Sequence, residues 1–472
     1  MAVFYNAGEV KTRPGVYQRY SNRGGSPLTG ARDGVCAIPI RSHWGPLNKV
    51  QRITSLSELE KIFGSGDYGT GHTVPAAAEL FRGGANTVYA YRIGTGGTAA
   101  SKAVTDGPTF TAKYPGAATL AVSVATKIGD SSTKVCNVYF GTELVETFEF
   151  AADGTAEGAN LVAATANSKY ITVTAASTVT TVAAIAAASG ALTGGADPTV
   201  TNASYSAAFA ALEGFPYNTI CLDVDDDSSM TLSLLLQAYL DNAYLKGKLA
   251  IAVVGEMTTV ALATRQTHSR AFNDAKVVYL GGGWKASDVS KDGALAIAYT
   301  AGLIAATPSN QGITHTAVTG ATDLCEELTY ADYEDCINAG MLMVSLSPDG
   351  QVWYDSSVNT LITPAGNEDD GWKKIRRVKV RFELFDRMDR LLARKVGKVS
   401  ADSDGIADIL QTGARLLASM AAEGKIRPGG IFAEDPDNPY TGDSAWFIIQ
   451  ADDIDSLEKI YLHYMFRYSQ NT

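Results

Sequence analysis

The chain has 472 residues, of which 46% are hydrophobic, and a formal net charge of -11 at pH 7. Its length and composition allow two to four domains with buried cores, which excludes a disordered chain and a small disulfide-dependent scaffold. The overall acidity disfavours a general nucleic-acid binder, because phosphate neutralisation requires a basic domain surface.

The N-terminus lacks a basic segment followed by an apolar one, and the chain nowhere contains eighteen consecutive uncharged apolar residues. We therefore expect no membrane span and synthesis in the cytoplasm. Five cysteines occur without a CxxC pair, which predicts free thiols rather than a disulfide framework or a zinc site. Nothing in the sequence calls for a cofactor.

Residues 1–22 contain RPGVY, a turn signal, and are predicted to form an N-terminal arm. A strand is expected over 34–50, a helix over 54–64, a helix through 76–81 and a strand over 86–93. This alternation predicts that an α/β domain begins within residues 23–95.

The composition changes after GTGGT at residue 94. Between residues 96 and 200, Ala, Ser and Thr fill 49 of 105 positions and only 13 are charged. Four strand-like runs are expected, at 119–125, 134–140, 144–150 and 170–181. Short strands with frequent turn signals predict an all-β domain inserted at 96–200.

The α/β rhythm resumes after the insertion. Apolar strands are expected over 218–226, 248–256 and 275–284, with helices between them and over 293–308. Residues 201–360 are therefore predicted to complete the domain that 23–95 begin. A C-terminal domain with two long helices is expected over 361–457, and an alternating strand or arm over 458–472. The predicted fold class is a multi-domain α/β (α+β) protein.

Catalytic motifs are sparse. Asp223, Asp225 and Asp227 follow a strand, where open α/β sheets bind ligands, but their spacing does not fit an EF-hand loop. Capping of the helix that begins near Met230 is the simpler interpretation. The histidines lie in no HExxH motif, and no GxSxG motif occurs, so no enzymatic activity is expected.

A basic stretch, GWKKIRRVKVRFELFDRMDRLLARKVGKV, covers residues 371–399. Its eleven Lys and Arg and three acids give it a net charge of +8 within an acidic chain. Read as a helix over 373–398, it has one apolar stripe, at Val378, Phe382, Phe385, Met388, Leu392 and Val396. A solvated helix face is one interpretation, and an acidic partner that offsets the repulsion is the other.

The chain resembles the tail sheath proteins of contractile bacteriophages and phage-tail-like bacteriocins. The resemblance is carried by the order of several motifs, namely RPGVY, VCAIPIRSHWGP (35–46), LFRGGANTVYAYRI (80–93), AKYPG (112–116), SPDGQVWYDSSVNTLIT (347–363) and SLEKIYLHYMFRYS (456–469). It extends over nearly the whole chain outside the insertion.

The resemblance implies a structural virion protein of the tail or of a tail-like particle. Sheath subunits stack as hexameric rings around a tail tube and contract to drive it through a bacterial envelope, for genome ejection in a phage. The implied partners are other copies of the chain, the tube protein, and baseplate and tail terminator proteins, with no nucleic acid and no metal. Extended arms would link the subunits by strand addition.

On this reading the basic stretch faces an acidic tube, through Lys373, Lys374, Arg377, Arg381, Arg387, Arg390, Arg394 and Lys398. The terminal strand would join a neighbouring subunit through Ile460, Leu462, Tyr464, Phe466 and Tyr468. The alternative is an α/β enzyme or ligand-binding protein that uses the Asp223–Asp227 loop, with the basic helix binding an anionic ligand.

Overall fold

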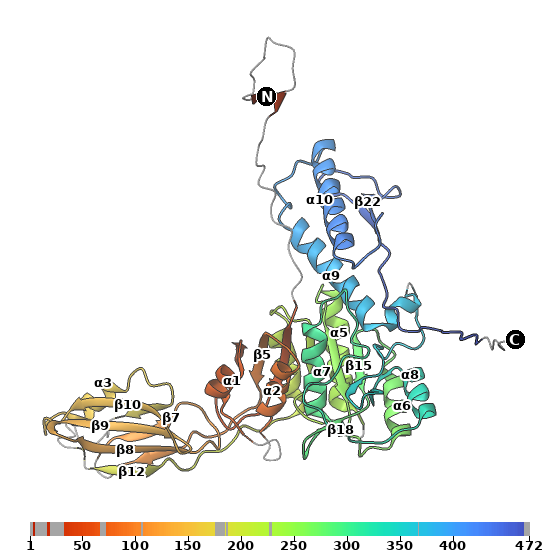
Figure 1. Cartoon of the computed structure of the whole chain (residues 1–472). Coiled ribbons are helices and arrows are strands. Elements are labelled where there is room, and N and C mark those ends of the chain that lie inside the picture. Colours follow the sequence, from red (N-terminus) through yellow and green to blue (C-terminus); the bar gives the residue numbers. More distant parts are fainter. Residues whose placement is uncertain are drawn as a thin grey trace.

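The structure is a computed structural model that describes residues 3–4, 17–18, 33–66, 72–104, 107–174, 185, 187–225, 229–366 and 368–466. Most of the predicted N-terminal arm lies outside these residues, apart from the parallel pair β1 (Val3–Phe4) and β2 (Tyr17–Gln18). Figure 1 shows a central α/β body, a β-rich body projecting from its side, and a helical body above it.

A seven-stranded sheet forms the central body, in the order β19-β15-β14-β13-β3-β5-β4. All neighbours are parallel except β4, which runs antiparallel to β5. The strands are β3 (Val35–Ile40), β4 (Val50–Ile53), β5 (Thr87–Arg92), β13 (Thr219–Cys221), β14 (Ile251–Gly255), β15 (Val277–Leu280) and β19 (Met341–Leu342). The parallel strands are almost wholly buried, as a sheet covered on both faces requires. This confirms the predicted α/β class.

Helices cover both faces of the sheet. Buried residues of α2 (Val74–Arg82) and α7 (Ala294–Ala306) belong to the core on one face, and α1 (Leu56–Phe63) packs beside α2. The other face is covered by α4 (Asn202–Leu212), α5 (Thr231–Leu245), α6 (Leu262–Phe272) and α8 (Tyr330–Asn338). Helices α2 and α7 approach closely, since a Cβ at Gly302 would lie 2.2 Å from the Leu80 carbonyl oxygen. Glycine is therefore required at this crossing.

Short strands complete the central body. The strands β16 (Trp284–Ala286), β17 (Val289–Lys291) and β18 (Asp323–Leu324) form one small sheet, and β20 (Val344–Leu346) and β21 (Val352–Tyr354) form a hairpin.

The β-rich body lies within residues 95–199 and has its own apolar core. One sheet contains β10 (Glu143–Ala151), β9 (Asp130–Phe140), β8 (Leu120–Lys127) and β12 (Ala188–Ala191), and the other β11 (Ile171–Thr174), β7 (Thr109–Ala112) and β6 (Ser101–Ala103). The expectation of an all-β insertion is wrong in one respect, because α3 (Glu157–Ala164) is a helix. Its Ala- and Leu-containing sequence favours a helix, and Leu161 packs into this core.

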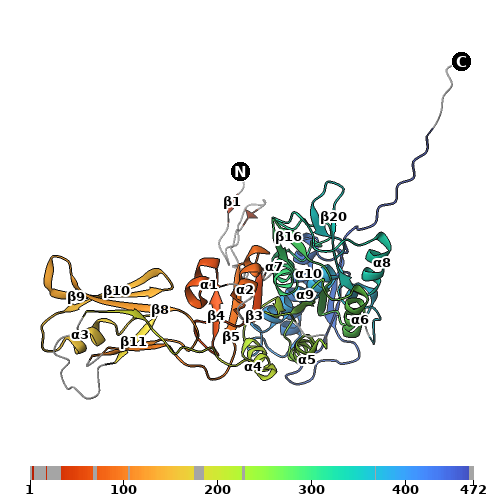
Figure 2. The ribbon, with the colours of Figure 1, turned by 90° about the horizontal axis from the view of Figure 1, so that it is seen from below.

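Figures 1 and 2 both show this body projecting from the β4–β5 side of the central sheet, on the side opposite to the C-terminal segment. Its two connections leave together, since Thr95 and Thr199 exchange backbone hydrogen bonds of 2.9 Å. The buried guanidinium of Arg92 donates to the Ser42 and Gly45 carbonyls of the central body and to the Pro115 carbonyl of the insertion. The junction is therefore tied by side chains as well as by the chain itself.

The helical body contains a 3-10 turn (Asp370–Lys373), α9 (Ile375–Leu392), α10 (Ser403–Ala422) and the hairpin β22 (Ile431–Glu434)–β23 (Phe447–Gln450). The helix expected over 373–398 ends at Leu392. Residues 393–398 form turns, in which Val396 is 78% exposed and Gly397 adopts φ 71. No apolar surface of the described chain covers Val396, and Gly397 after it has a left-handed backbone conformation. The helix therefore does not continue through these residues.

Candidate assembly surfaces

Helix α9 is buried on two sides. Val378 and Phe382 belong to the core of the central body. Val380, Leu384 and Met388 belong to a separate core shared with α10. The predicted single stripe is therefore partly wrong: it included Phe385, which is 41% exposed, and Val396, and it missed Val380 and Leu384 on the side that faces α10. The helix connects the central body to the helical body through both of these apolar contacts.

The first half of the basic stretch is neutralised by the chain's own acids. Arg377 donates from Nε and Nη2 to the Asp453 carboxylate, at 2.8 and 2.7 Å, and Arg381 donates to the same carboxylate at 3.1 Å. Lys374 forms an ion pair with Glu458, and the Lys373 ammonium lies 2.9 Å from Asp370. These four predicted tube-facing cations therefore already have anionic partners.

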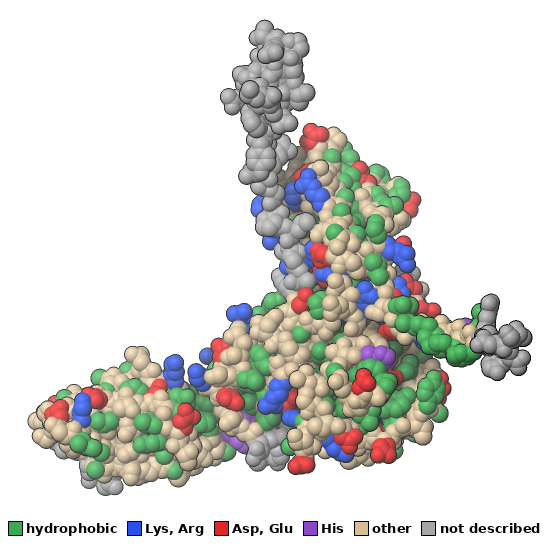
Figure 3. All heavy atoms as spheres, viewed as in Figure 1, with side chains coloured by type: hydrophobic (Ala, Val, Ile, Leu, Met, Phe, Trp, Pro, Cys, Tyr) green, Lys and Arg blue, Asp and Glu red, His purple; other side chains and the backbone are tan. Residues whose placement is uncertain are grey.

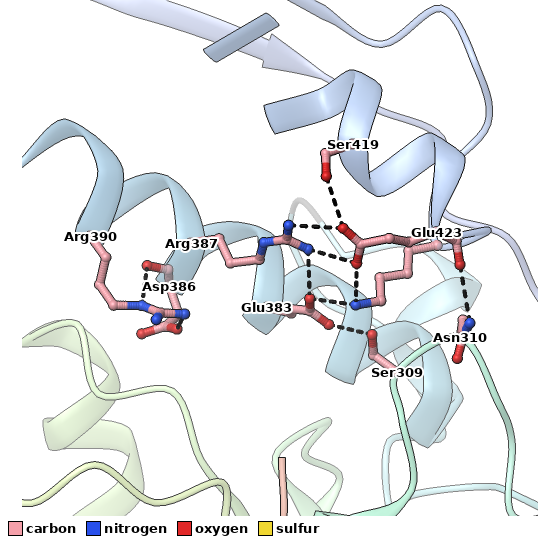
Figure 4. Close-up of polar contacts among 9 residues, drawn as sticks. Ser309, Asn310, Glu383, Asp386, Arg387, Arg390, Ser419 and Glu423 are labelled. Carbon is pink, nitrogen blue, oxygen red and sulfur yellow. Dashed lines mark hydrogen bonds and ion pairs between the residues drawn. The ribbon is translucent and has the colours of Figure 1, made fainter. Parts of the chain in front are cut away.

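Arg387 does not lie on a free surface either. Its side chain is 2% exposed and donates to Glu383 at 3.0 Å and to both oxygens of Glu423 at 2.9 Å. Lys425 pairs with the same two acids, at 2.6 and 2.7 Å (Figure 4). The bonds from Arg387 hold the pKa of Glu423 at about 2. The structure contradicts a tube contact by Arg387, because its guanidinium is buried and bound to Glu383 and Glu423 of the same chain.

This ion network joins three parts of the chain. Glu383 lies on α9, Glu423 follows α10, and Ser309 of the central body donates its hydroxyl to Glu383. Figure 4 shows the side chains converging between the two helices and the loop that carries Ser309. Two cations and two acids balance in this network. Arg387, Glu383 and Lys425 are less than 10% exposed and Glu423 is 36% exposed, so mostly buried ion pairs hold the helical body against the central body.

The remaining predicted cations differ in exposure. Arg390 pairs with Asp386 one turn earlier in α9. Arg394 and Lys398 lie in the exposed turns after α9, and neither has an ion-pair partner among the residues that the structure describes. Of the eight cations, these two are the ones with free charge for an external partner, and tube contact by them stays a prediction.

The C-terminal segment is extended and exposed. Its side chains include Ile460 (72% exposed), Leu462, Tyr464 and Phe466 (93% exposed), while Tyr468 lies outside the described residues. Residues 459–466 form no backbone hydrogen bond with another described residue. Figure 3 shows hydrophobic side chains gathered along this segment as it leaves the body. Exposed apolar side chains in a row mark an interaction site.

The β22–β23 hairpin offers a second exposed apolar surface. It packs on α10 through Phe432, whose ring lies so close to the helix that a Cβ at Gly413 would be 2.3 Å away. Ile431, Ile449 and Trp446 are exposed. An isolated two-stranded sheet has unpaired backbone groups on both outer edges, so it can accept further strands.

The acidic loop after β13 is structural. Asp223 is fully buried and accepts hydrogen bonds from the Tyr205 hydroxyl (2.7 Å), the Thr73 hydroxyl and the Arg41 backbone (3.1 Å). Burial raises its pKa. Asp225 accepts from the backbone N–H of Ala294 and so caps the start of α7.

These contacts occupy the edge of the sheet where a ligand would bind. Asp227 lies outside the described residues. Within the described part of the chain no group of three or more His, Cys, Asp or Glu residues could hold a metal ion. The same part contains no helix long and apolar enough to cross a membrane.

Sequence reasoning identified the basic stretch but missed its partners. Asp453 and Glu458 lie in the run DDIDSLE, an acidic segment directly before the apolar C-terminus. That run of opposite charge was the available signal.

Comparisons with known proteins agree with this architecture. Residues 199–360 match the family model for the phage tail sheath protein central domain. The chain is 25% identical to the uncharacterized protein YqbK of Bacillus subtilis, over 97% of this chain and 98% of that protein.

Solved structures show the same fold. A sheath tail protein of Desulfitobacterium hafniense superposes with a TM-score of 0.72 at 19% identity, covering 93% of this chain and 100% of that chain. The helical sheath of the anti-feeding prophage in its contracted state gives a TM-score of 0.57 at 11% identity, covering 97% and 99%.

Proposed function

We propose that this chain, which has a phage tail sheath central domain and the fold of tail sheath proteins, is the subunit that forms the contractile sheath of a phage or phage-like tail particle. The comparisons confirm the resemblance that the sequence predicted. A structural role follows from this similarity, and we propose no enzymatic activity. The buried contacts of Asp223 with Tyr205 and Thr73 support this, because they make that carboxylate unavailable to a ligand.

The observation that carries the proposal is an exposed apolar C-terminal segment in a chain that also has a sheet of only two strands, β22 and β23, among its described residues. Residues 459–466 present exposed apolar side chains and form no backbone hydrogen bond with another described residue. The β22–β23 hairpin presents free edges and exposed Ile431 and Ile449. We assign residues 458–472 as an arm that adds a strand to this hairpin in a neighbouring subunit. Residues 1–22 are the second arm, and strand addition supplies main-chain hydrogen bonds in both cases.

In the assembly, subunits stack as hexameric rings around a tail tube, with the helical body toward the tube. The β-rich body (96–200) projects outward, which agrees with its position away from the helical body in Figure 1. Contraction moves the subunits as rigid bodies while the arms keep them connected. The further partners are the tube, baseplate and tail terminator proteins, and synthesis takes place in the host cytoplasm.

Negative-stain electron microscopy of the purified full-length chain tests this function. We expect rings, tubes or long sheath-like polymers. Compact particles of one small fixed mass, at all concentrations and salt conditions, would contradict it. Adding purified tube protein from the same particle should give sheathed tubes whose diameter exceeds that of the bare tube.

A further inference from the structure

The first turns of α9 face an acidic segment of the same chain. Residues 452–458 contain four acids, Asp452, Asp453, Asp455 and Glu458. They follow β23 and run across the start of α9 before the exposed segment begins. Their backbone is tied to the turn after α10, since Ile454 N–H donates to the Lys425 carbonyl (3.0 Å) and Arg427 N–H donates to the Asp452 carbonyl (2.7 Å). We call residues 453–458 the arm root.

Three side chains of the arm root bind α9 or its neighbourhood. Asp453, 9% exposed, takes the paired hydrogen bonds from Arg377 and a further bond from Arg381. Ser456 accepts from Arg376 Nη1 at 3.2 Å. Glu458 pairs with Lys374 and accepts from the Thr314 hydroxyl at 2.9 Å. The contacts reach the first two turns of α9, the residue before the helix, Lys374, and the loop that carries Thr314, so the root is held along its length and not at one point.

The cations beneath the root depend on it. Arg376 is 7% exposed, and its Nε atom has no hydrogen-bond partner within the part of the chain that the structure describes. Burial lowers the pKa of Arg376, and the nearby acids of the root act in the opposite direction. Removing the root would leave Arg376 and Arg377 as neighbouring cations with reduced access to water, while Arg381 would keep its bonds to Asp369. The root is therefore costly to detach.

The contacts end abruptly. Glu458 is the last residue of the segment whose side chain bonds to another part of the described chain. From Lys459 to Phe466 the side chains are exposed, and Tyr464 and Phe466 stack on each other. A bound root followed directly by a free arm is the arrangement of a peptide that is anchored in its own subunit and reaches into another.

We infer that the basic start of α9 is a binding surface for the arm root in cis, which fixes residues 453–458 to their own subunit and makes Lys459 the first residue that can leave it. The surface recognises an acidic peptide by one paired Arg–carboxylate contact and one Lys–carboxylate contact five residues later. The binding itself is a property of the single chain. Only its consequence, that tension on the arm is transmitted to α9 during contraction, rests on the proposed sheath function.

Amide hydrogen exchange of the unassembled full-length chain, read by mass spectrometry, tests this inference. In the wild type, a peptide covering 452–458 should exchange slowly and a peptide covering 460–466 rapidly. Asp453→Asn should raise exchange in 452–458 by on the order of tenfold or more, because charge-assisted hydrogen bonds to Arg377 and Arg381 are lost. Asp452→Asn is the matched control: Asp452 is exposed, its neutralisation changes the net charge equally, and exchange should stay at the wild-type rate.

Equal exchange in Asp453→Asn and Asp452→Asn would overturn the inference, as would rapid exchange of the root in the wild type. If Asp453→Asn also accelerates exchange in α10, the substitution loosens the whole helical body. The variant Arg377→Lys then separates loss of the root contact from this general loosening. This variant keeps the charge but not the paired geometry, so it should accelerate the root alone. None of these measurements requires polymerisation, so the result can be interpreted even if the chain does not form a sheath.

Discussion

The indole ring of Trp44 stacks on the phenol ring of Tyr170, with ring centroids 5.8 Å apart and an interplanar angle of 12°. Trp44 follows β3 of the central body, whereas Tyr170 directly precedes β11 of the inserted body. Trp44 is buried in the apolar core of the insertion. The central body therefore contributes a core side chain to the insertion, and the insertion cannot be removed without exposing an indole.

Removal of the insertion should preserve assembly if this side chain is also replaced. Thr95 and Thr199 form an antiparallel hydrogen-bonded pair, so a two-residue Gly-Ser linker can replace residues 96–198. With Trp44→Ser added, we expect a folded subunit that still forms tubes, because the insertion projects outward. The same deletion with Trp44 retained should aggregate. Tube formation is checked by negative-stain microscopy, and a folded deletion variant that does not polymerise would make the insertion an assembly element.

Acid should destabilise the junction through His72. This buried histidine lies beside His43, with ring centroids 5.0 Å apart, and burial lowers the pKa of His72 to about 4. An unfolded histidine has a pKa near 6.5, so the unfolded state binds more protons between these values. Stability is fully present above about pH 6.5 and falls by about 3 kcal/mol as the pH drops to about 4.

Urea unfolding at pH 4 to 7 measures this loss. His72→Asn should flatten the profile over that range, whereas His463→Asn, on the exposed C-terminal segment, should keep the wild-type profile. An unchanged slope in His72→Asn would assign the acid sensitivity to other groups.

Removal of residues 459–472 should abolish long tubes while the subunit stays folded. The cut after Glu458 keeps the ion pair with Lys374, so the helical body remains intact. Leu462→Pro is a subtler change, since it removes one backbone donor from the added strand, and we expect shorter polymers. The length distribution in micrographs, with circular dichroism for folding, gives the result. Normal tubes from the truncated chain would show that the segment adds no strand to a neighbour.

Attachment to the tube should depend on Arg394 and Lys398. Changing both to Glu alters the local charge by four units without touching an ion pair within the described structure. We expect sheath polymers that form without a tube but no longer co-sediment with preformed tubes. Wild-type attachment should weaken with salt, because the Debye length falls from ~10 Å at 0.1 M to ~3 Å at 1 M.

The control for this prediction is Lys49→Glu with Arg52→Glu, which makes the same change on exposed residues of the central body. It should leave tube binding intact. Substituting Arg377 and Arg381 would not test attachment, because their loss also releases Asp453. Equal binding by the Arg394/Lys398 variant and the control would place the tube contact elsewhere.

Loss of Arg387 should be costly for stability. Arg387→Met leaves Glu383 and Glu423 with Lys425 as the one remaining cation of the network, and we expect a loss of about 3 to 5 kcal/mol in unfolding free energy. Lys395→Met breaks the pair of two partly exposed side chains, Lys395 and Asp408, and should cost less than about 1 kcal/mol. Chemical denaturation compares them. Similar costs for both variants would mean that the network does not hold the two bodies together.

The sequence by itself determined the alternation of the central body and many element limits. Helix α1, for example, is predicted over 54–64, and it begins after Ser55, whose side chain accepts from the Glu58 N–H, and ends before Gly64 with φ 77. These features are local, since propensity, caps and glycine turns depend on residues a few positions apart. The sequence also revealed the basic excess over 371–399 and the alternating apolar end.

Only the tertiary structure decided where that basic charge is neutralised. Arg377 and Asp453 are 76 residues apart in sequence, and their contact exists because β23 returns the chain to the start of α9. Periodicity indicated one apolar side of α9, but the second side became visible only once α10 was packed against Val380 and Leu384. The sequence around Trp44 likewise indicates only a turn, and the tertiary structure shows that Trp44 lies in the core of the insertion. Long-range ion pairs and shared cores arise from chain segments that folding brings together, and a linear pattern does not encode which segments meet.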